Sequence, residues 1–180
     1  MFDQLSNLAH TLERMHTLYE RAAELLDSER NSLAKMNFEA LYAELREKDE
    51  VLSIIRRLDK ERLKFQDHFA MINGLDPAAV TLKTIGDSLV EQGASSVALG
   101  NRLLAVRARI QNIVFQIKER VALNESFIDK SISHIRGLAE IYSQAFSSEA
   151  PGKKQHSTYT GKRVVQKAPQ TSGKILEKRL

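Results

Sequence analysis

The chain has 180 residues, a formal net charge of +4, and neither cysteine nor tryptophan. The absence of cysteine excludes disulfide bonds and thiolate metal sites, and it suits a reducing compartment. No segment approaches the roughly 20 consecutive apolar residues that a membrane-spanning helix requires. The N-terminus has polar residues where a signal peptide has a continuous apolar run. We therefore expect a soluble cytoplasmic protein without stable insertion in a membrane.

From Leu5 to Leu33, large apolar residues recur every three or four positions and form a stripe along one side of a helix. The stripe is broader than the seam of a two-stranded coiled coil, which is typical of a helix in a bundle. This pattern predicts the first helix over residues 3–35.

The second predicted helix covers residues 37–72. Asn37 is its expected N-cap, because an asparagine side chain accepts a hydrogen bond from the free amides of the first turn. Two cations, Lys48 and Arg62, interrupt the apolar stripe of this helix. Long cationic side chains can lie along an apolar surface with their charged ends in water, and we expect both residues to do so.

A short third helix is predicted over residues 77–91. The dipeptide Asn73-Gly74 ends the helix before it, and Asp76-Pro77 is the expected start, with the aspartate as N-cap and the proline in the first turn.

The fourth predicted helix, over residues 96–147, is the longest. Its apolar stripe changes phase near Arg120 and Asn124, so the pattern leaves open whether the helix is continuous there. The second half is apolar over so wide an arc that it must be buried on two sides. We expect one side to pack on the chain's own bundle and the other to bind a partner.

The last 30 residues differ in composition from the rest. Residues 151–180 contain eight lysines and arginines against one glutamate, a net charge of +7, which leaves −3 for residues 1–150. Such a segment cannot offset an ordering cost of about 1–2 kcal/mol per residue. Together the patterns predict an all-α fold: an elongated antiparallel helical bundle or coiled-coil hairpin over residues 1–149, followed by a flexible cationic tail over residues 150–180.

Signals for catalysis are poor. The five histidines have no metal-ligand spacing, and the sequence has no HExxH, GxSxG or GxxxxGK[ST] motif. We expect no enzyme, no cofactor and no metal site. The cationic tail suggests a nucleic-acid partner, but it has one aromatic residue and the rest of the chain is slightly acidic. Binding of this kind would be salt-sensitive, and we expect no nucleic-acid partner.

Three stretches together resemble the FlgN family. They are "ERNSLAKMNFEALYAELREKDEVLSIIRRLDKER" (29–62), "ALNESFIDKSISHIRGLAEIY" (122–142) and, in the tail, "STYTGKR" followed by "SGKILEK". The resemblance implies a flagellar type III export chaperone that holds the hook-associated proteins of the hook–filament junction and binds their C-terminal segments. It further implies that a tail tyrosine, here Tyr159, contacts the export-gate protein FlhA.

The resemblance places client binding on the helix face over residues 121–146. A helical face of this kind can receive a partner helix. A structural coiled-coil adaptor or scaffold that dimerises through the same face is the alternative, so a homo-oligomer stays open. The predicted client-binding residues are Val121, Phe127, Ile128, Ile132, Ile135, Leu138 and Tyr142.

Overall fold

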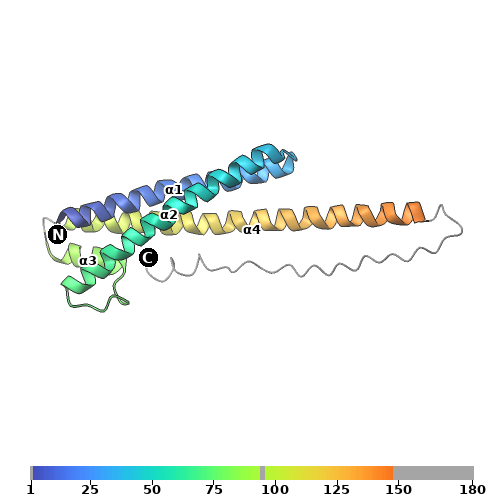
Figure 1. Ribbon diagram of the computed structural model, residues 1–180. Helices are drawn as coiled ribbons and strands as arrows, with labels where there is room; N and C mark the ends of the chain where they lie inside the picture. The colour runs from blue at the N-terminus through green and yellow to red at the C-terminus, as the bar shows by residue number, and fades with distance from the viewer. Residues whose placement is uncertain (1, 94–95, 148–180) are drawn as a thin grey trace.

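The computed structural model describes residues 2–93 and 96–147, which form four helices and no strand (Figure 1). The helices are α1 (Phe2–Ala34), α2 (Phe38–Ile72), α3 (Leu82–Glu91) and α4 (Val97–Ser147). The predicted all-α bundle with a very long last helix is therefore confirmed. The predicted cationic tail lies outside the described residues.

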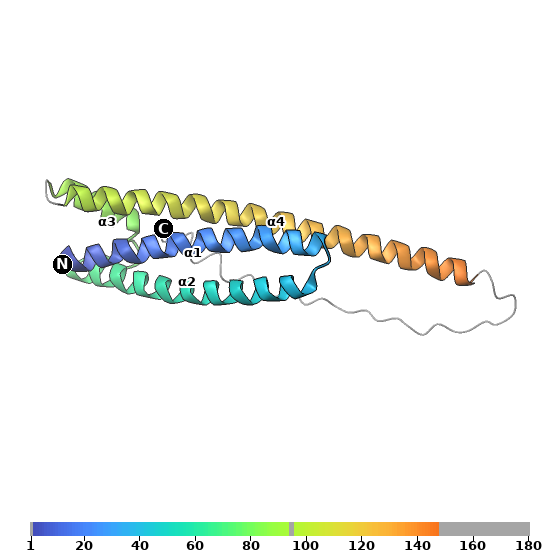
Figure 2. The same ribbon diagram turned by 90° about the horizontal axis from the view of Figure 1, so that it is seen from above.

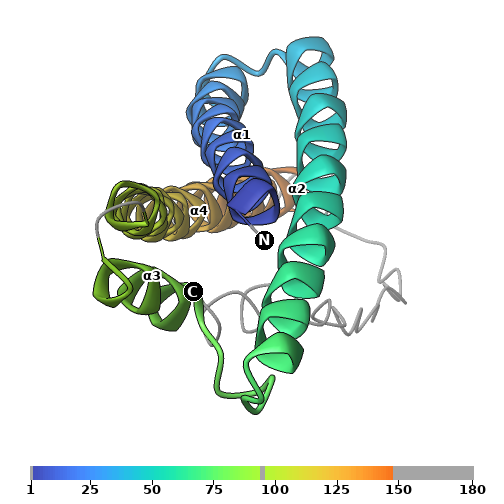
Figure 3. The same cartoon turned by 90° about the vertical axis from the view of Figure 1, so that its left-hand side faces the viewer.

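The core forms around α1, which packs against α2 on one side and against α4 on another (Figure 3). The short helix α3 packs against α4. The stripe of α1 that the sequence predicts is buried, and the valines, leucines and isoleucines of the other helices close over it. Side chains that are almost completely buried include Leu8, Leu12, Met15, Leu58, Leu82, Ile85, Leu103, Val106 and Ile110.

The helices α1 and α2 form an antiparallel hairpin. Near its tip the carboxylate of Glu44 on α2 accepts hydrogen bonds from Ser28 and Ser32 on α1, the latter at 3.0 Å. Asn37 caps α2 as predicted, and its side-chain oxygen accepts from the amide of Ala40 at 3.2 Å.

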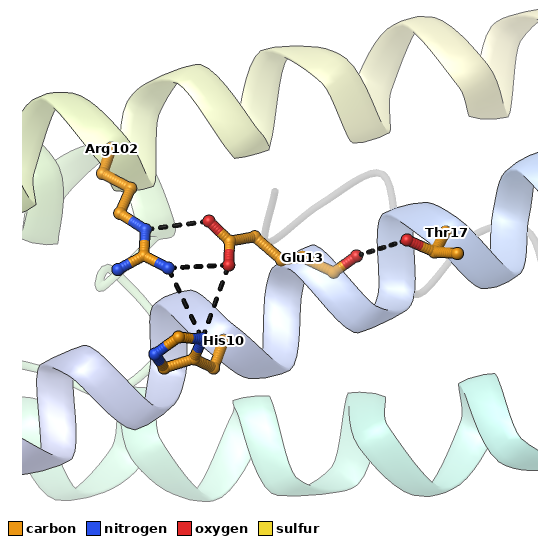
Figure 4. A network of polar contacts seen from close by, with 4 residues as sticks. All are labelled: His10, Glu13, Thr17 and Arg102. Atoms are coloured by element: carbon orange, nitrogen blue, oxygen red, sulfur yellow. Dashed lines mark hydrogen bonds and ion pairs between the residues drawn. The ribbon is translucent and has the colours of Figure 1, made fainter.

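The helix α4 runs in the same direction as α1, because Glu13 contacts Arg102 while Leu26 contacts Asn124. The Arg102 guanidinium donates to both carboxylate oxygens of Glu13, at 2.8 and 2.7 Å, with His10 beside them (Figure 4). These hydrogen bonds hold the pKa of the Glu13 carboxyl below its ordinary value. The pair is partly exposed, so we expect it to contribute at most about 1 kcal/mol while it sets the register of the two helices.

The third helix begins at Leu82 rather than at residue 77, so its predicted start is wrong. Asp76 caps only a turn, in which its carboxylate accepts from the Ala78 amide at 3.0 Å. The helix is started by Thr81, whose hydroxyl accepts from the Thr84 amide at 3.1 Å in a reciprocal capping box. Two caps compete for the start here, and the one with the capping box forms the helix.

The two cations of α2 were expected to keep their charged ends in water, and for Arg62 this expectation is wrong. The Arg62 side chain is completely buried; its guanidinium donates to Asp59 at 2.8 Å and to Gln66 at 2.8 Å. Lys48 forms an ion pair with the buried Glu29 of α1. A buried charge is tolerated when it is paired and hydrogen-bonded. Asp59 and Gln66 lie on α2 itself, one turn from Arg62, whereas Glu29 lies on α1, and the apolar periodicity of α2 reveals neither kind of partner.

Candidate functional site: the extension of α4

The helix α4 is continuous over its 51 residues, without a break near Arg120 or Asn124. Those two residues mark the last polar contacts with α1: Arg120 donates to Asp27 at 3.0 Å, and the Asn124 amide donates to the backbone oxygen of Leu26 at 2.8 Å. Figure 2 shows α4 continuing well past the turn that joins α1 and α2. We call residues 125–147 the α4 extension.

Burial ends where the extension begins. Asn124 is 7% exposed, and no residue of the extension whose burial the structure describes is buried. At 1.5 Å per residue the extension is about 34 Å long. The sequence predicted that one side of this segment packs on the chain's own bundle. The structure contradicts that prediction for most of the segment, because α1 ends at Ala34, only eight residues past its contact with Asn124, and none of residues 125–146 is buried.

Six of the seven predicted client-binding residues lie on the α4 extension and Val121 lies one turn before it, all with accessible side chains. Phe127 is half-buried, and the other six are exposed, from 36% for Val121 to 63% for Tyr142. Steps of three and four residues from Asn124 lead to Ile128, Ile132 and Ile135, so this row continues the side of α4 that faces α1. The structure thus brings the predicted residues together on one uncovered surface.

Other apolar side chains of this region were missed as site residues. Leu123, Ile141 and Phe146 are 56%, 64% and 73% exposed. Leu123 and Ile141 belong to the wide apolar arc of the sequence, which was the signal that could have found them. Large apolar patches left open to water commonly mark interaction sites.

The opposite side of the extension is polar. Asp129, Ser133, Arg136 and Glu140 are exposed and lie on the side away from most of the apolar side chains when projected at 3.6 residues per turn. Charges of both signs along this side keep it in water, so the extension is amphipathic and has a defined face for a partner.

Two small hollows lie near the start of α1 among the described residues. One between α1 and α2 has room for about 20 Å³ and is lined by Leu5, Leu8, Phe65, Phe69 and neighbouring side chains, which is space for about one water molecule. A wider, shallow hollow beside it is lined by Gln4, Glu61, Lys64, Phe65 and His68. Among the residues that the structure describes, no group of three or more histidine, aspartate or glutamate side chains is placed to hold a metal ion.

The fold is an elongated helical bundle in which one long amphipathic helix end is uncovered. Such a surface is typical of proteins that bind another polypeptide. The family model described as FlgN protein matches residues 1–162. The chain therefore belongs to the FlgN family, which is the flagellar export chaperone family. None of its described helices is long and apolar enough to cross a membrane.

No curated protein and no solved structure matches the chain at the threshold applied. The matched region includes the α4 extension and the position of Tyr159. Tyr159 itself lies outside the residues that the structure describes.

Proposed function

We propose that this protein is a cytoplasmic export chaperone that binds the C-terminal segments of flagellar hook-associated proteins through the α4 extension. One observation carries the proposal: α4 continues the side that packs on α1 for about 34 Å beyond Asn124, its last polar contact with α1. Membership of the FlgN family supports the class of client. Client binding of this kind requires no catalytic step and no cofactor.

Binding of this kind explains how premature assembly is prevented. The C-terminal segments of the clients assemble through apolar helical surfaces, and a segment packed on α4 is not free to assemble. Burial of six or seven large apolar side chains contributes on the order of 10–15 kcal/mol before costs. Association and ordering cancel much of this, which leaves micromolar to nanomolar affinity. A chaperone that must release its client needs affinity in that range.

A double substitution on the extension tests the client surface. Ile128→Asp with Ile135→Asp should abolish client binding, because it places two charges in the apolar row, while helix content stays largely intact. The measurement is co-purification of hook-associated proteins from cytoplasm, together with circular dichroism.

The matched control is Ser126→Asp with Ser133→Asp, which introduces the same charges at the same spacing on the exposed polar side of α4. This control variant should bind clients like the unmodified protein. If the isoleucine double variant still co-purified with hook-associated proteins, the α4 extension would not be the client surface.

Delivery to the export gate is proposed to use the tail. Tyr159→Ala should leave the fold and client binding intact and weaken both docking to FlhA and export of the client. Motility assays and a pull-down with the cytoplasmic domain of FlhA measure these effects. Full motility in this variant would remove Tyr159 from the proposed docking step.

A further inference from the structure

The apolar side chains at the uncovered end of α4 form two rows rather than one. Row one continues the side that faces α1, and row two lies roughly 100° around the helix from it at 3.6 residues per turn. Every side chain of the two rows is exposed except Phe127, which is half-buried. Row one consists of Ile128, Ile132, Ile135, Tyr142 and Phe146, and row two of Leu123, Phe127, Leu138 and Ile141.

The first half of α4 shows how this protein covers apolar side chains on two adjacent sides of one helix. Between Val97 and Asn124 the helix packs against two neighbours, α1 and α3. Contacts on two sides locate them: Arg102 binds Glu13 of α1, and Gly100 lies against Gly86 of α3. Of these neighbours, α3 lies beside the start of α4, and α1 ends eight residues past its contact with Asn124, so most of the extension continues beyond both (Figure 2).

One helix cannot cover both rows of the extension. A helix within a bundle touches two neighbouring helices, one on each of two adjacent sides, and rows about 100° apart fit that arrangement. The polar side with Asp129 and Glu140 limits the number of neighbours to two, since a third would bury those carboxylates.

We propose, on the basis of the function proposed above, that the α4 extension binds two helices of one client molecule side by side. Row one takes one client helix in the place that α1 occupies further back, and row two takes the other. A second copy of this chain is a poorer occupant. Its own hairpin stops at the same point, so it offers a single uncovered helix and leaves one row open.

Single substitutions in the full-length protein separate the rows. Ile135→Asp in row one and Ile141→Asp in row two should each lower the affinity for the C-terminal segment of a hook-associated protein by at least about tenfold. Ser133→Asp on the polar side is the matched control and should stay within about twofold. Titration calorimetry with the purified client segment measures the affinities.

Photo-cross-linking shows what lies on each row. The photoreactive residue p-benzoylphenylalanine is placed at position 132 for row one or at position 141 for row two. Mass spectrometry of the complexes should map the two positions to different helical segments of the same client.

The outcomes separate this inference from the proposed function. If Ile135→Asp weakens binding and Ile141→Asp does not, or if both positions cross-link to one segment, a single helix binds and the two-helix proposal is overturned. Cross-links from position 141 to a second copy of the chain, with a dimeric mass in light scattering, overturn it as well. If neither isoleucine variant changes the affinity, the proposed client surface itself fails and this inference fails with it.

Discussion

The core of this protein is not purely apolar, because it contains a few buried polar side chains. Arg62 is buried with Asp59 and Gln66, and Tyr19 of α1 is 6% exposed. The described residues offer the Tyr19 hydroxyl no hydrogen-bond partner. Burial, followed by the Asp59 carboxylate, raises the pKa of Tyr19 well above its ordinary value, while Arg62 acts in the opposite direction. The hydroxyl therefore contributes little to stability at neutral pH and opposes it in alkali.

Tyr19→Phe should leave the free energy of unfolding at pH 7 unchanged or raise it by about 1 kcal/mol, because it removes an unsatisfied buried hydroxyl. Since the folded protein holds the tyrosine proton more tightly than the unfolded chain, stability from this group is complete below pH 10 and falls above it. The loss is about 1.4 kcal/mol per pH unit. Urea denaturation of both proteins at pH 7, 10 and 11 measures the difference. Equal losses in the two proteins would show that Tyr19 titrates normally in the fold.

At the scale of elements, the contact between α3 and α4 depends on two glycines. A Cβ built on Gly100 would lie 2.8 Å from the backbone oxygen of Gly86 and 2.9 Å from a methyl group of Val90. A backbone oxygen inside a helix cannot move away as a flexible side chain can. Sequence reasoning treats a glycine inside a helix as a weakness, whereas at this crossing glycine permits the close approach of two helices.

Gly100→Ala should therefore destabilise the protein by about 1–3 kcal/mol, because it forces α3 away from α4. Gly137→Ala in the extension is the matched control, since nothing lies within 4 Å of its Cβ position. That variant should not lower the free energy of unfolding, and it should add up to about 1 kcal/mol of local helix stability. Thermal and urea denaturation compare the two. A Gly100→Ala variant as stable as Gly137→Ala would mean that α3 and α4 are not in close contact.

At the scale of the whole molecule, the chain is divided into a packed body and an uncovered helix end. The first half of α4 contributes Leu103, Val106 and Ile110 to the core. None of the extension's described residues is buried, and in proteins most of the stability of a helix comes from the packing of its amphipathic face. A client that packs on the extension therefore stabilises the helix as it binds.

Hydrogen exchange tests this division. Amides of residues 135–145 should exchange at least about 100-fold faster than amides of residues 103–113, because local opening of the extension breaks no core contact. Addition of the client segment should slow exchange in the extension and leave the core unchanged. Equal protection of the two halves in the free protein would show that something already covers the extension.

Much of the fold could be predicted because the apolar periodicity that marks a helix is a local property of the sequence. The predicted bounds of three helices lie within one residue of the observed ones. The start of α3 was missed, since Asp76 and Thr81 are both acceptable caps and only packing chooses between them. The hydrogen bonds of buried Arg62 with residues one turn away on α2, and the ion pair of Lys48 with Glu29 on α1, were missed. Apolar periodicity shows which side of a helix is buried but not which polar side chains pair there.

The sequence by itself determined that this chain forms long amphipathic helices and that the last helix carries more apolar surface than one neighbour can cover. Periodicity is a property of a single helix, so it can be read without a partner. Only the tertiary structure decided which part of that surface stays open. The register in which Arg102 meets Glu13 and Asn124 meets Leu26 sets how far α1 extends along α4. Because α1 ends at Ala34, none of the helices that the structure describes packs along most of the remainder of α4.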